Sequence, residues 1–361
     1  MRLCIATIAL CALVSACDVD ESSSTAAPAQ SQGKTLGFAL AYMDGVYKQQ
    51  DDKADCPDGF RYTSREQWEA QFATRAARQV HLNRCIEINN RGPNCENGWF
   101  QPMAIDDPLP VREVQNTIAQ GADLDGVGDA VATPRTCAHR NFVSPDGTAG
   151  IDNQFHRFIG CNKTVRGFRE EGWRRGVAGR AVYWLLLEVV GVDDERNDGD
   201  VQVTMYRSRD PVTLDANLKA PPWQTKRIDG GPHGVLFSTR GKIIDGMLVT
   251  DPVNVEWERE YYEQRLLIRD MSLRLKLTPT GAEGLRVGYI DLDKFWASYA
   301  RYMSGMGVLY GASGPSDFRA LHRLADGYKN PETGACTALS SAHRLEFVHA
   351  HLIHPDVERK P

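Results

Sequence analysis

The sequence predicts a mainly β protein of the α+β class, built around a central antiparallel β-sandwich or jelly roll. A series of strand-like runs separated by turn residues fills residues 181–292, and no segment of helical periodicity lies between them. Residues 271–278 alternate apolar and polar side chains, as in a strand with one buried and one solvated face. Helical periodicity is found before and after this region. We therefore expect a helical, disulfide-pinned N-terminal region and C-terminal helices around the sandwich.

Residues 1–16 have the pattern of a bacterial lipoprotein signal peptide. Arg2 gives a positive start, and residues 3–14 form an apolar run that is too short to span a bilayer as a permanent helix. The segment "VSAC", which ends at Cys17, closely resembles a lipobox, in which the cysteine is lipidated and begins the mature chain. The resemblance implies an envelope lipoprotein of the proteobacterial type and brings no activity with it. An ordinary secretory signal cleaved nearby is the alternative.

Residues 17–36 are expected to form a flexible tether. Residues 18–34 are rich in Ser, Ala and Gln, so they cannot bury enough apolar surface to offset the entropy of ordering. A lipidated cysteine followed by such a tether would hold a folded domain near the membrane, facing the periplasm. Asp18, in the second mature position, resembles a signal for retention in the inner membrane, which favours that membrane over the outer one.

The region 37–165 is predicted to be helical and rich in loops. Residues 35–50 contain a short amphipathic run, and residues 64–83 begin with a Ser-x-x-Gln capping box and continue at helical spacing. Residues 102–150 show little periodicity and much Asp, Gly and Pro, which is typical of a segment held by a disulfide or a metal. Asp152 is placed to cap a short helix that ends near residue 159.

Residues 166–292 form the predicted sandwich, and residues 293–361 form a helical cap packed on it. The candidate strands are residues 181–192, 201–208, 234–239, 242–250, 253–260, 266–278 and 285–292. In the cap, helical spacing covers residues 293–303 and 315–328, with Pro315 and Ser316 at the start of the second helix. Residues 345–353 are predicted to be a final strand or helix.

Cysteine usage agrees with an oxidising compartment. Of nine cysteines, Cys4 and Cys11 leave with the signal and Cys17 carries lipid. An even number remains, which indicates up to three disulfides with fifteen connectivities. These residues are Cys56, Cys85, Cys95, Cys137, Cys161 and Cys336. Closeness in sequence favours the pairs Cys85–Cys95 and Cys137–Cys161, which leaves Cys56–Cys336.

The segment "DLDGVGD" is the strongest candidate for an ion site. Asp123, Asp125 and Asp129 supply oxygen ligands of the kind that calcium prefers, and the glycines between them allow a sharp turn. The segment resembles a thrombospondin type-3 or EF-hand-like calcium loop, but Val127 stands where a third ligand is common and no Glu closes the loop. Completing ligands are expected among Asp106, Asp107, Asp146 and Asp152. A plain Asx turn is the alternative interpretation.

Two histidines near the C-terminus form a second candidate metal site. His349 and His351 would share one face of a strand, a spacing that zinc and copper sites use. No carboxylate or cysteine is marked by the sequence as a third ligand. Surface or interface histidines are therefore the competing interpretation.

The strand-like run "VEWEREYYE" offers the one candidate for catalysis. Glu256, Glu258 and Glu260 would share one strand face, and glycosidases place paired carboxylates on strands in a similar way. Trp257 would point to the opposite face. A solvated strand face is the competing interpretation, because the sequence lacks the spacing of the best-known enzymes of this kind.

Composition and the absence of several sequence motifs reduce the number of function classes to consider. The net charge of −5 gives no reason to expect a nucleic-acid partner. The sequence contains no nucleotide, haem or flavin signature and no Gly-x-Ser-x-Gly motif. We expect a non-catalytic binding or envelope-assembly protein with structural calcium, anchored by lipid and facing an unknown envelope ligand or protein. An envelope polysaccharide hydrolase is the alternative.

Overall fold

A computed structural model of the chain describes residues 33–45, 52–61, 74, 76, 98–104, 111–162, 165–166, 185–211, 213–259, 264–306 and 312–355. All of them belong to one unit, Gly33–Pro361. The predicted signal peptide, Cys17, Asp18, nearly all of the tether and, apart from residues 74 and 76, the predicted helix over residues 64–83 lie outside these ranges. Within the described ranges, no helix is both long enough and apolar enough to cross a membrane.

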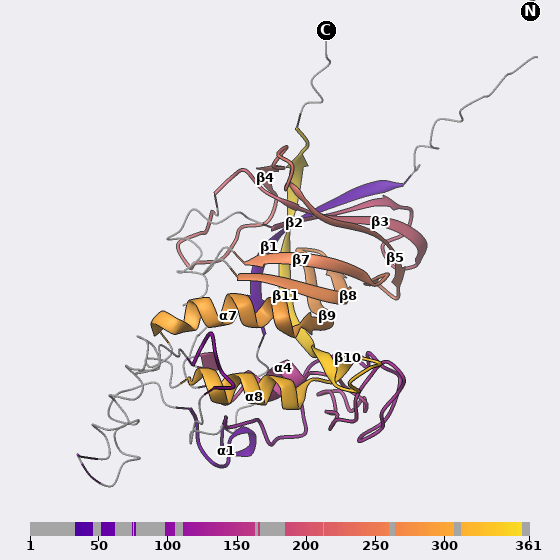
Figure 1. The fold of residues 1–361 in the computed structure, drawn as a ribbon. Helices are drawn as coiled ribbons and strands as arrows, with labels where there is room; N and C mark the ends of the chain where they lie inside the picture. The colour runs from indigo at the N-terminus through magenta and orange to yellow at the C-terminus, as the bar shows by residue number, and fades with distance from the viewer. Residues whose placement is uncertain are drawn as a thin grey trace, which may run out of the picture. The chain divides into compact units, whose positions relative to one another are not determined.

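Eight antiparallel strands close into a barrel (Figure 1). In order around the ring, they are β1 (Lys34–Asp44), β2 (Leu185–Val192), β3 (Asp198–Arg207), β5 (Val235–Ile244), β6 (Met247–Thr250), β8 (Gln264–Thr278), β9 (Gly281–Asp291) and β11 (Cys336–Ile353). The ring closes because β1 pairs with β2 on one side and with β11 on the other. Closure pairs both edges of every strand in this ring, which removes the exposed edges of an open sheet.

Three shorter strands extend the ring. β7 (Val253–Arg259) pairs with β8, and β10 (Gly327–Lys329) pairs with the start of β11. β4 (Gln224–Arg227) runs parallel to the end of β11. The expected mainly β, antiparallel centre is therefore confirmed, and the predicted central strands are found with shifted ends. The strands form a closed barrel, and the sandwich or jelly roll that we expected is not confirmed.

The helical interpretation of residues 35–50 is wrong where the structure describes them, because Lys34–Asp44 is strand β1. Every residue from Phe38 to Met43 is buried. Phe38 and Leu40 pack into the main core cluster, while Ala39 and Ala41 pack on the other side with Leu186. A strand that is buried on both faces shows no apolar–polar alternation, so its residues do not reveal the two-residue period.

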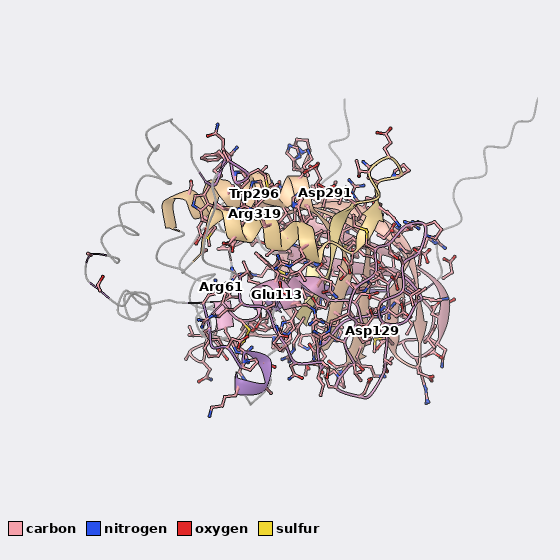
Figure 2. The ribbon with its side chains drawn as sticks, turned by 60° about the horizontal axis from the view of Figure 1, so that its bottom comes forward. Arg61, Glu113, Asp129, Asp291, Trp296 and Arg319 are labelled. Carbon is pink, nitrogen blue, oxygen red and sulfur yellow. A yellow bond between two sulfur atoms is a disulfide. The ribbon has the colours of Figure 1, made fainter. Side chains whose placement is uncertain are left out.

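The main core continues from the barrel into the helices at one end. α7 (Leu292–Met306), α8 (Gly314–Leu324) and the short helix α4 (Gln154–Ile159) lie against this end of the barrel, and the short helix α1 (Asp52–Asp55) lies beyond them (Figure 1). Phe295 and Leu321 of these helices share one core cluster with Leu345 of β11. Figure 2 turns this end of the unit forward and labels Trp296 of α7 and Arg319 of α8. The two C-terminal helices are found close to the predicted ranges, and residues 345–353 form a strand rather than a helix. That strand, β11, belongs to the barrel, so residues 293–361 are not a purely helical cap.

Buried ion pairs fasten the loop region to the helices. The Nη1 of Arg61 donates to Oδ1 of Asp317 in α8 at 2.8 Å, and the hydroxyl of Tyr299 in α7 donates to Oδ2 at 2.8 Å. Arg61 also donates to the carbonyl of Phe158 in α4 at 3.1 Å. Burial raises the pKa of Asp317, an effect that the Arg61 charge opposes. These bonds compensate Asp317 for the loss of water, so removing Arg61 would leave a buried carboxylate without its counter-charge.

Two disulfides join residues that are far apart in sequence. Cys56 is bonded to Cys161, and Cys137 is bonded to Cys336, over separations of 105 and 199 residues. The predicted pairs Cys137–Cys161 and Cys56–Cys336 are therefore wrong, while Cys85 and Cys95 lie outside the described residues. Closeness in sequence failed as a guide because the fold brings together sulfurs of distant segments, Cys161 from just after α4 and Cys336 from the start of β11.

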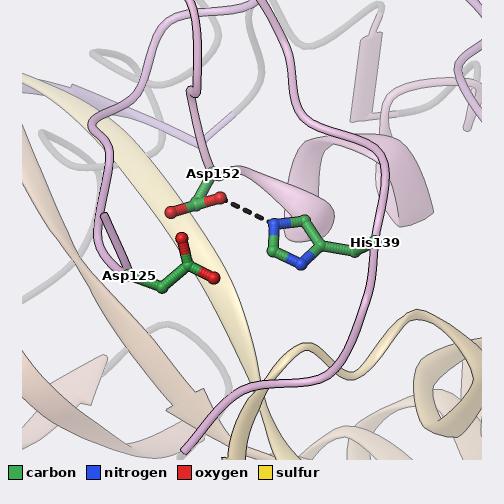
Figure 3. Close-up of side chains that lie close together, drawn as sticks. All are labelled: Asp125, His139 and Asp152. Atoms are coloured by element: carbon green, nitrogen blue, oxygen red, sulfur yellow. Dashed lines mark hydrogen bonds and ion pairs between the residues drawn. The ribbon is translucent and has the colours of Figure 1, made fainter. Parts of the chain in front are cut away.

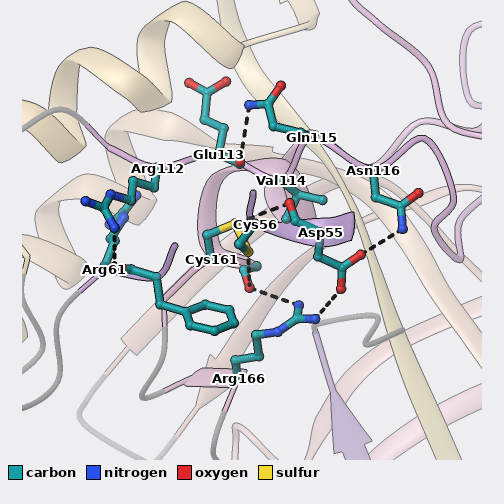
Figure 4. Close-up of a disulfide and its surroundings, with 12 residues drawn as sticks. Asp55, Cys56, Arg61, Arg112, Glu113, Val114, Gln115, Asn116, Cys161 and Arg166 are labelled. Atoms are coloured by element: carbon teal, nitrogen blue, oxygen red, sulfur yellow. Dashed lines mark hydrogen bonds and ion pairs between the residues drawn. A yellow bond between two sulfur atoms is a disulfide. The ribbon is translucent and has the colours of Figure 1, made fainter. Parts of the chain in front are cut away.

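The Cys56–Cys161 bond belongs to a small buried apolar cluster that is flanked by charged and polar side chains (Figure 4). Asp55, next to Cys56, forms a buried ion pair with Arg166 and accepts a hydrogen bond from Nδ2 of Asn116 at 2.8 Å. The disulfide and the ion pair thus tie α1 to the segment after α4, and the segment that contains Asn116 is held between them.

The disulfide pairing can be tested by peptide mapping. Digestion of the oxidised protein without reductant should yield one peptide pair linked through Cys56 and Cys161 and another linked through Cys137 and Cys336. Replacing Cys56 and Cys161 together by Ser should lower the free energy of unfolding by about 4 kcal/mol, because a loop of this length loses its constraint in the unfolded chain. A linked pair containing Cys137 and Cys161 would contradict the structure.

A buried histidine predicts a pH dependence of stability. Burial of His156 in α4 lowers its pKa to about 4, and the charges of Arg166 and Arg157 add to this against the opposing charge of Asp55. Between pH 6.5 and 4 the unfolded chain binds a proton that the folded chain does not. The free energy of unfolding should therefore fall by about 2 kcal/mol between pH 7 and 5.

Urea unfolding at the two pH values measures this loss in wild type and in His156→Gln. The variant, which has no titrating group at this position, should lose about 2 kcal/mol less than wild type over the same interval. Comparing the pH-dependent losses cancels any stability difference between the two proteins at neutral pH. Equal losses would show that His156 is not held neutral by the fold.

Candidate metal centre

Three metal-ligating side chains converge where the irregular segment 111–153 meets the barrel (Figure 3). One ligand atom from each of Asp125, His139 and Asp152 lies within 4.8 Å of the others. In the parts of the chain that the structure describes, this is the one group of three His, Cys, Asp or Glu side chains arranged in this way. We refer to Asp125, His139 and Asp152 as the cluster.

Asp152 is fixed by backbone bonds just before α4. Its N–H donates to the carbonyl of Ala122 at 2.9 Å, and its Oδ2 accepts from the N–H of Leu124 at 2.7 Å. The Oδ1 atom lies 2.7 Å from Nε2 of His139. The side chain is fully buried, so its orientation depends on these bonds rather than on solvent. The predicted short helix is confirmed, but its N-cap is Asn153 rather than Asp152.

His139 is held with Nε2 toward the carboxylates. Its Nδ1 lies 2.9 Å from the carbonyl of Cys137, and because a carbonyl only accepts, Nδ1 carries the proton of this bond. Burial alone would lower the pKa of His139, but the hydrogen bond to Asp152 and the charge of Asp326 outweigh it and raise the pKa to about 9. With no cation bound, the ring is therefore positively charged at neutral pH.

Asp125 reaches the cluster from a tight loop. Its Oδ1 accepts from the N–H of Val127 at 3.0 Å, and Oδ1 of Asp123 accepts from the N–H of Gly126 at 2.7 Å. Gly126 has a φ of +75°, a conformation that glycine adopts without steric cost. The Oδ2 of Asp125 is buried and has no hydrogen-bond partner among the described residues. The turn thus leaves one carboxylate oxygen directed inward and unbonded.

A third carboxylate, that of Asp326, adjoins the cluster from the segment between α8 and β10. Its side chain is 0% exposed, and its Oδ1 accepts from the N–H of Ser340 at 2.7 Å. Its Oδ2 lies 3.8 Å from Nε2 of His139 and has no hydrogen-bond partner in the described parts of the chain. Burial raises the pKa of Asp326 to about 7, against the opposing effects of His139 and Ser340.

The structure brings together only part of the ligand set expected from sequence. Asp125 and Asp152 meet, whereas Asp123 and Asp129 are not members of the cluster. Oδ1 of Asp129 accepts from the N–H of Asn141 at 2.8 Å. Asp146 is exposed in its own turn, and Asp106 and Asp107 lie outside the described residues. The calcium assignment of this loop stays a prediction.

Sequence reasoning missed His139 and Asp326. The sequence carried one signal for His139, its position between Cys137 and the Asp-rich loop in a segment already expected to be pinned. Asp326 carried no signal, because an Asp-Gly pair after a helix is an ordinary turn sequence.

The two C-terminal histidines lie in an aromatic stack. The ring of His349 lies between Phe38, with centroids 4.9 Å apart, and Trp223, with centroids 4.5 Å apart. His351 is exposed and tilted against Trp223 at 5.7 Å. Neither histidine belongs to a group of three ligating side chains in the ranges that the structure covers. The stack accounts for the position of His349 without an ion.

The structure describes the side chains of only part of the glutamate run. Glu256 is exposed on β7, and Trp257 is buried on the opposite face under the guanidinium of Arg286, 4.8 Å from its ring. Trp257 is therefore a core residue rather than the floor of a surface site. The side chains of Glu258 and Glu260 lie outside the described residues, and the catalytic role of the three glutamates stays a prediction.

Comparison with known proteins adds nothing to this geometry. No family model, curated protein or solved structure matches the chain. A function for this protein therefore has to be inferred from the chemistry of the cluster.

Proposed function

We propose that this protein is a lipid-anchored, periplasm-facing binding or envelope-assembly protein whose folded unit is stabilised by a divalent cation at the cluster. The observation that carries the cation site is the buried Oδ2 of Asp125, which has no hydrogen-bond partner among the described residues. It lies in a group whose ligating atoms, from Asp125, His139 and Asp152, are within 4.8 Å of one another. A buried carboxylate oxygen without a partner is costly unless a cation or a proton compensates it.

The enclosure of the cluster favours a structural role for the cation over a catalytic one. The side chain of His139 is 7% exposed and that of Asp152 is 0% exposed. A catalytic metal keeps an open position for water and substrate, whereas structural sites are closed by protein ligands. Asp125 is half-buried, so two of the three ligating side chains are enclosed. A cation held by these loop residues would stabilise the loop region, which supports the proposal that the protein binds or assembles rather than hydrolyses.

The membrane anchor rests on the sequence before the folded unit. The lipobox-like "VSAC" segment ending at Cys17 and the polar tether after it support attachment through lipid, with Asp18 favouring the inner membrane. The polysaccharide hydrolase remains the alternative, but the exposed Glu256 lends it no support.

Thermal unfolding tests the cation site. Adding Zn²⁺ or Ca²⁺ to chelator-treated protein should raise Tm by several degrees, because a ligand at a hundredfold excess over its Kd stabilises the folded state by about 2.7 kcal/mol. The increase should vanish in Asp125→Asn, which keeps the size of the side chain. Asp129→Asn, from the same loop but outside the cluster, is the matched control and should keep the increase. A Tm that no cation changes would overturn the site.

Membrane fractionation tests the anchor. Wild-type protein should be found in the membrane fraction of a bacterial host that processes lipoproteins, and metabolic labelling with a fatty acid should mark it. Cys17→Ser should carry no label and move to the soluble fraction. Unchanged membrane association of Cys17→Ser would contradict the lipobox assignment.

A further inference from the structure

We propose that Asp326 is the fourth ligand of the cation and that the site binds a four-coordinate transition ion of the Zn²⁺ type in preference to Ca²⁺. This inference rests on the proposed cation site and specifies its ligands and its metal. It starts from the fully buried side chain of Asp326, whose Oδ2 points at His139 and has no hydrogen-bond partner among the described residues.

The three carboxylates share one arrangement. In each, a backbone N–H occupies one oxygen: Val127 donates to Oδ1 of Asp125, Leu124 to Oδ2 of Asp152 and Ser340 to Oδ1 of Asp326. The other oxygen of each carboxylate has no backbone donor, which makes it the oxygen that is more readily available to an ion. The backbone bonds also fix which oxygen that is, so the donors are oriented before any ion arrives.

The donor count separates the two classes of metal. Asp125, Asp152 and Asp326 give three oxygens, and Nε2 of His139 gives one nitrogen. Ca²⁺ requires six to eight oxygen ligands and uses bidentate carboxylates to reach that number. Zn²⁺ in closed sites takes four ligands and readily accepts imidazole nitrogen. Four donors of this kind match Zn²⁺, whereas Ca²⁺ would need at least two further oxygens, from carbonyl groups or water.

The two distances from His139 lie on either side of the value for a tetrahedral ion. Ligands about 2.0–2.1 Å from Zn²⁺ in a tetrahedron lie about 3.3 Å from one another. From Nε2 of His139, Oδ1 of Asp152 lies at 2.7 Å and Oδ2 of Asp326 at 3.8 Å. Both distances differ from the tetrahedral value by roughly half an ångström. Asp326 is not among the side chains whose ligand atoms all lie within 4.8 Å of one another, so its carboxylate also has to move toward Asp125 or Asp152 when the ion binds.

The surroundings of His139 complete a metal-binding arrangement. The carbonyl of Cys137 holds the proton on Nδ1, which leaves the lone pair of Nε2 available once an ion replaces the proton there. The disulfide from Cys137 to Cys336 and the bond from the Cys137 N–H to the Asp326 carbonyl at 2.8 Å hold the two sides together. The segments that carry His139 and Asp326 are therefore held next to each other by the disulfide and by this hydrogen bond.

Metal titration of the oxidised full chain tests the inference. After chelator treatment, isothermal titration should show one Zn²⁺ bound per chain and Ca²⁺ bound at least a hundredfold more weakly. Asp326→Asn should weaken Zn²⁺ binding at least tenfold, whereas Asp129→Asn should bind Zn²⁺ like wild type. Circular dichroism checks that each variant is folded.

The absorption spectrum of Co²⁺ bound to wild type gives an independent readout of ligand number. It should have the intense visible bands of a four-coordinate ion. The weak bands of a six-coordinate ion would overturn the inference even if Asp326→Asn failed to fold.

The outcomes distinguish the two proposals. Wild-type affinity in Asp326→Asn, together with loss of binding in Asp125→Asn, would overturn the role of Asp326 and leave the cation site standing. Binding of Ca²⁺ as tight as that of Zn²⁺ would overturn the choice of metal alone. If wild type bound none of Zn²⁺, Ca²⁺ and Co²⁺, both the cation site and the role of Asp326 would be overturned. A proton on Asp326 would then compensate the charge of this buried carboxylate.

Discussion

The antiparallel pairing of β1 with β11 is the contact on which the rest of the described structure depends. It brings residues 38–44 against residues 344–349 and turns a twisted sheet into a closed ring. Opening this pair would expose the backbone N–H and C=O groups of two long strands and part of the main core. The ring also gives β11 a fixed position, and β11 continues past the barrel into the loop region.

The cluster depends on that continuation of β11. The early residues of the strand carry Ser340, whose N–H binds Asp326 and whose hydroxyl accepts from the N–H of Gln154 at 3.0 Å, and they carry Cys336, which is bonded to Cys137. The cluster residues themselves lie in segments with little regular structure. Backbone N–H groups and one disulfide fix the geometry of these residues, and β11 supplies part of both. The long strand thus positions charged side chains that lie outside the helices and strands themselves.

Much of the fold could be predicted from sequence wherever one face of an element meets water. Leu273 and Leu275 alternate with the exposed Arg274 and Lys276, and β8 was found for that reason. β1 was missed because the alternating signal disappears when both faces are buried. Closure of the barrel was missed as well, since it depends on a pairing between the two ends of the folded unit and no local pattern records it.

Prediction of the cluster from sequence was limited in the same way. Asp125 and Asp152 were among the predicted ligands because spaced aspartates in a glycine-rich loop suggest oxygen donors. Asp326 lies about two hundred residues further along the chain, and only the fold brings it beside His139. The disulfides failed for the related reason that proximity in space, rather than proximity in sequence, decides which sulfurs meet.

The position of β1 and β11 at opposite ends of the folded unit has a consequence for how the chain acquires its structure. During synthesis or translocation β1 emerges before the other strands. Its pairing with β11 cannot form until nearly the whole chain has appeared. Its two partners in the ring, β2 and β11, are separated from it by some 140 and 300 residues, so the barrel has a high contact order and is expected to close slowly. Until then one edge of this apolar strand has no partner, and the incomplete chain is prone to aggregate through that edge.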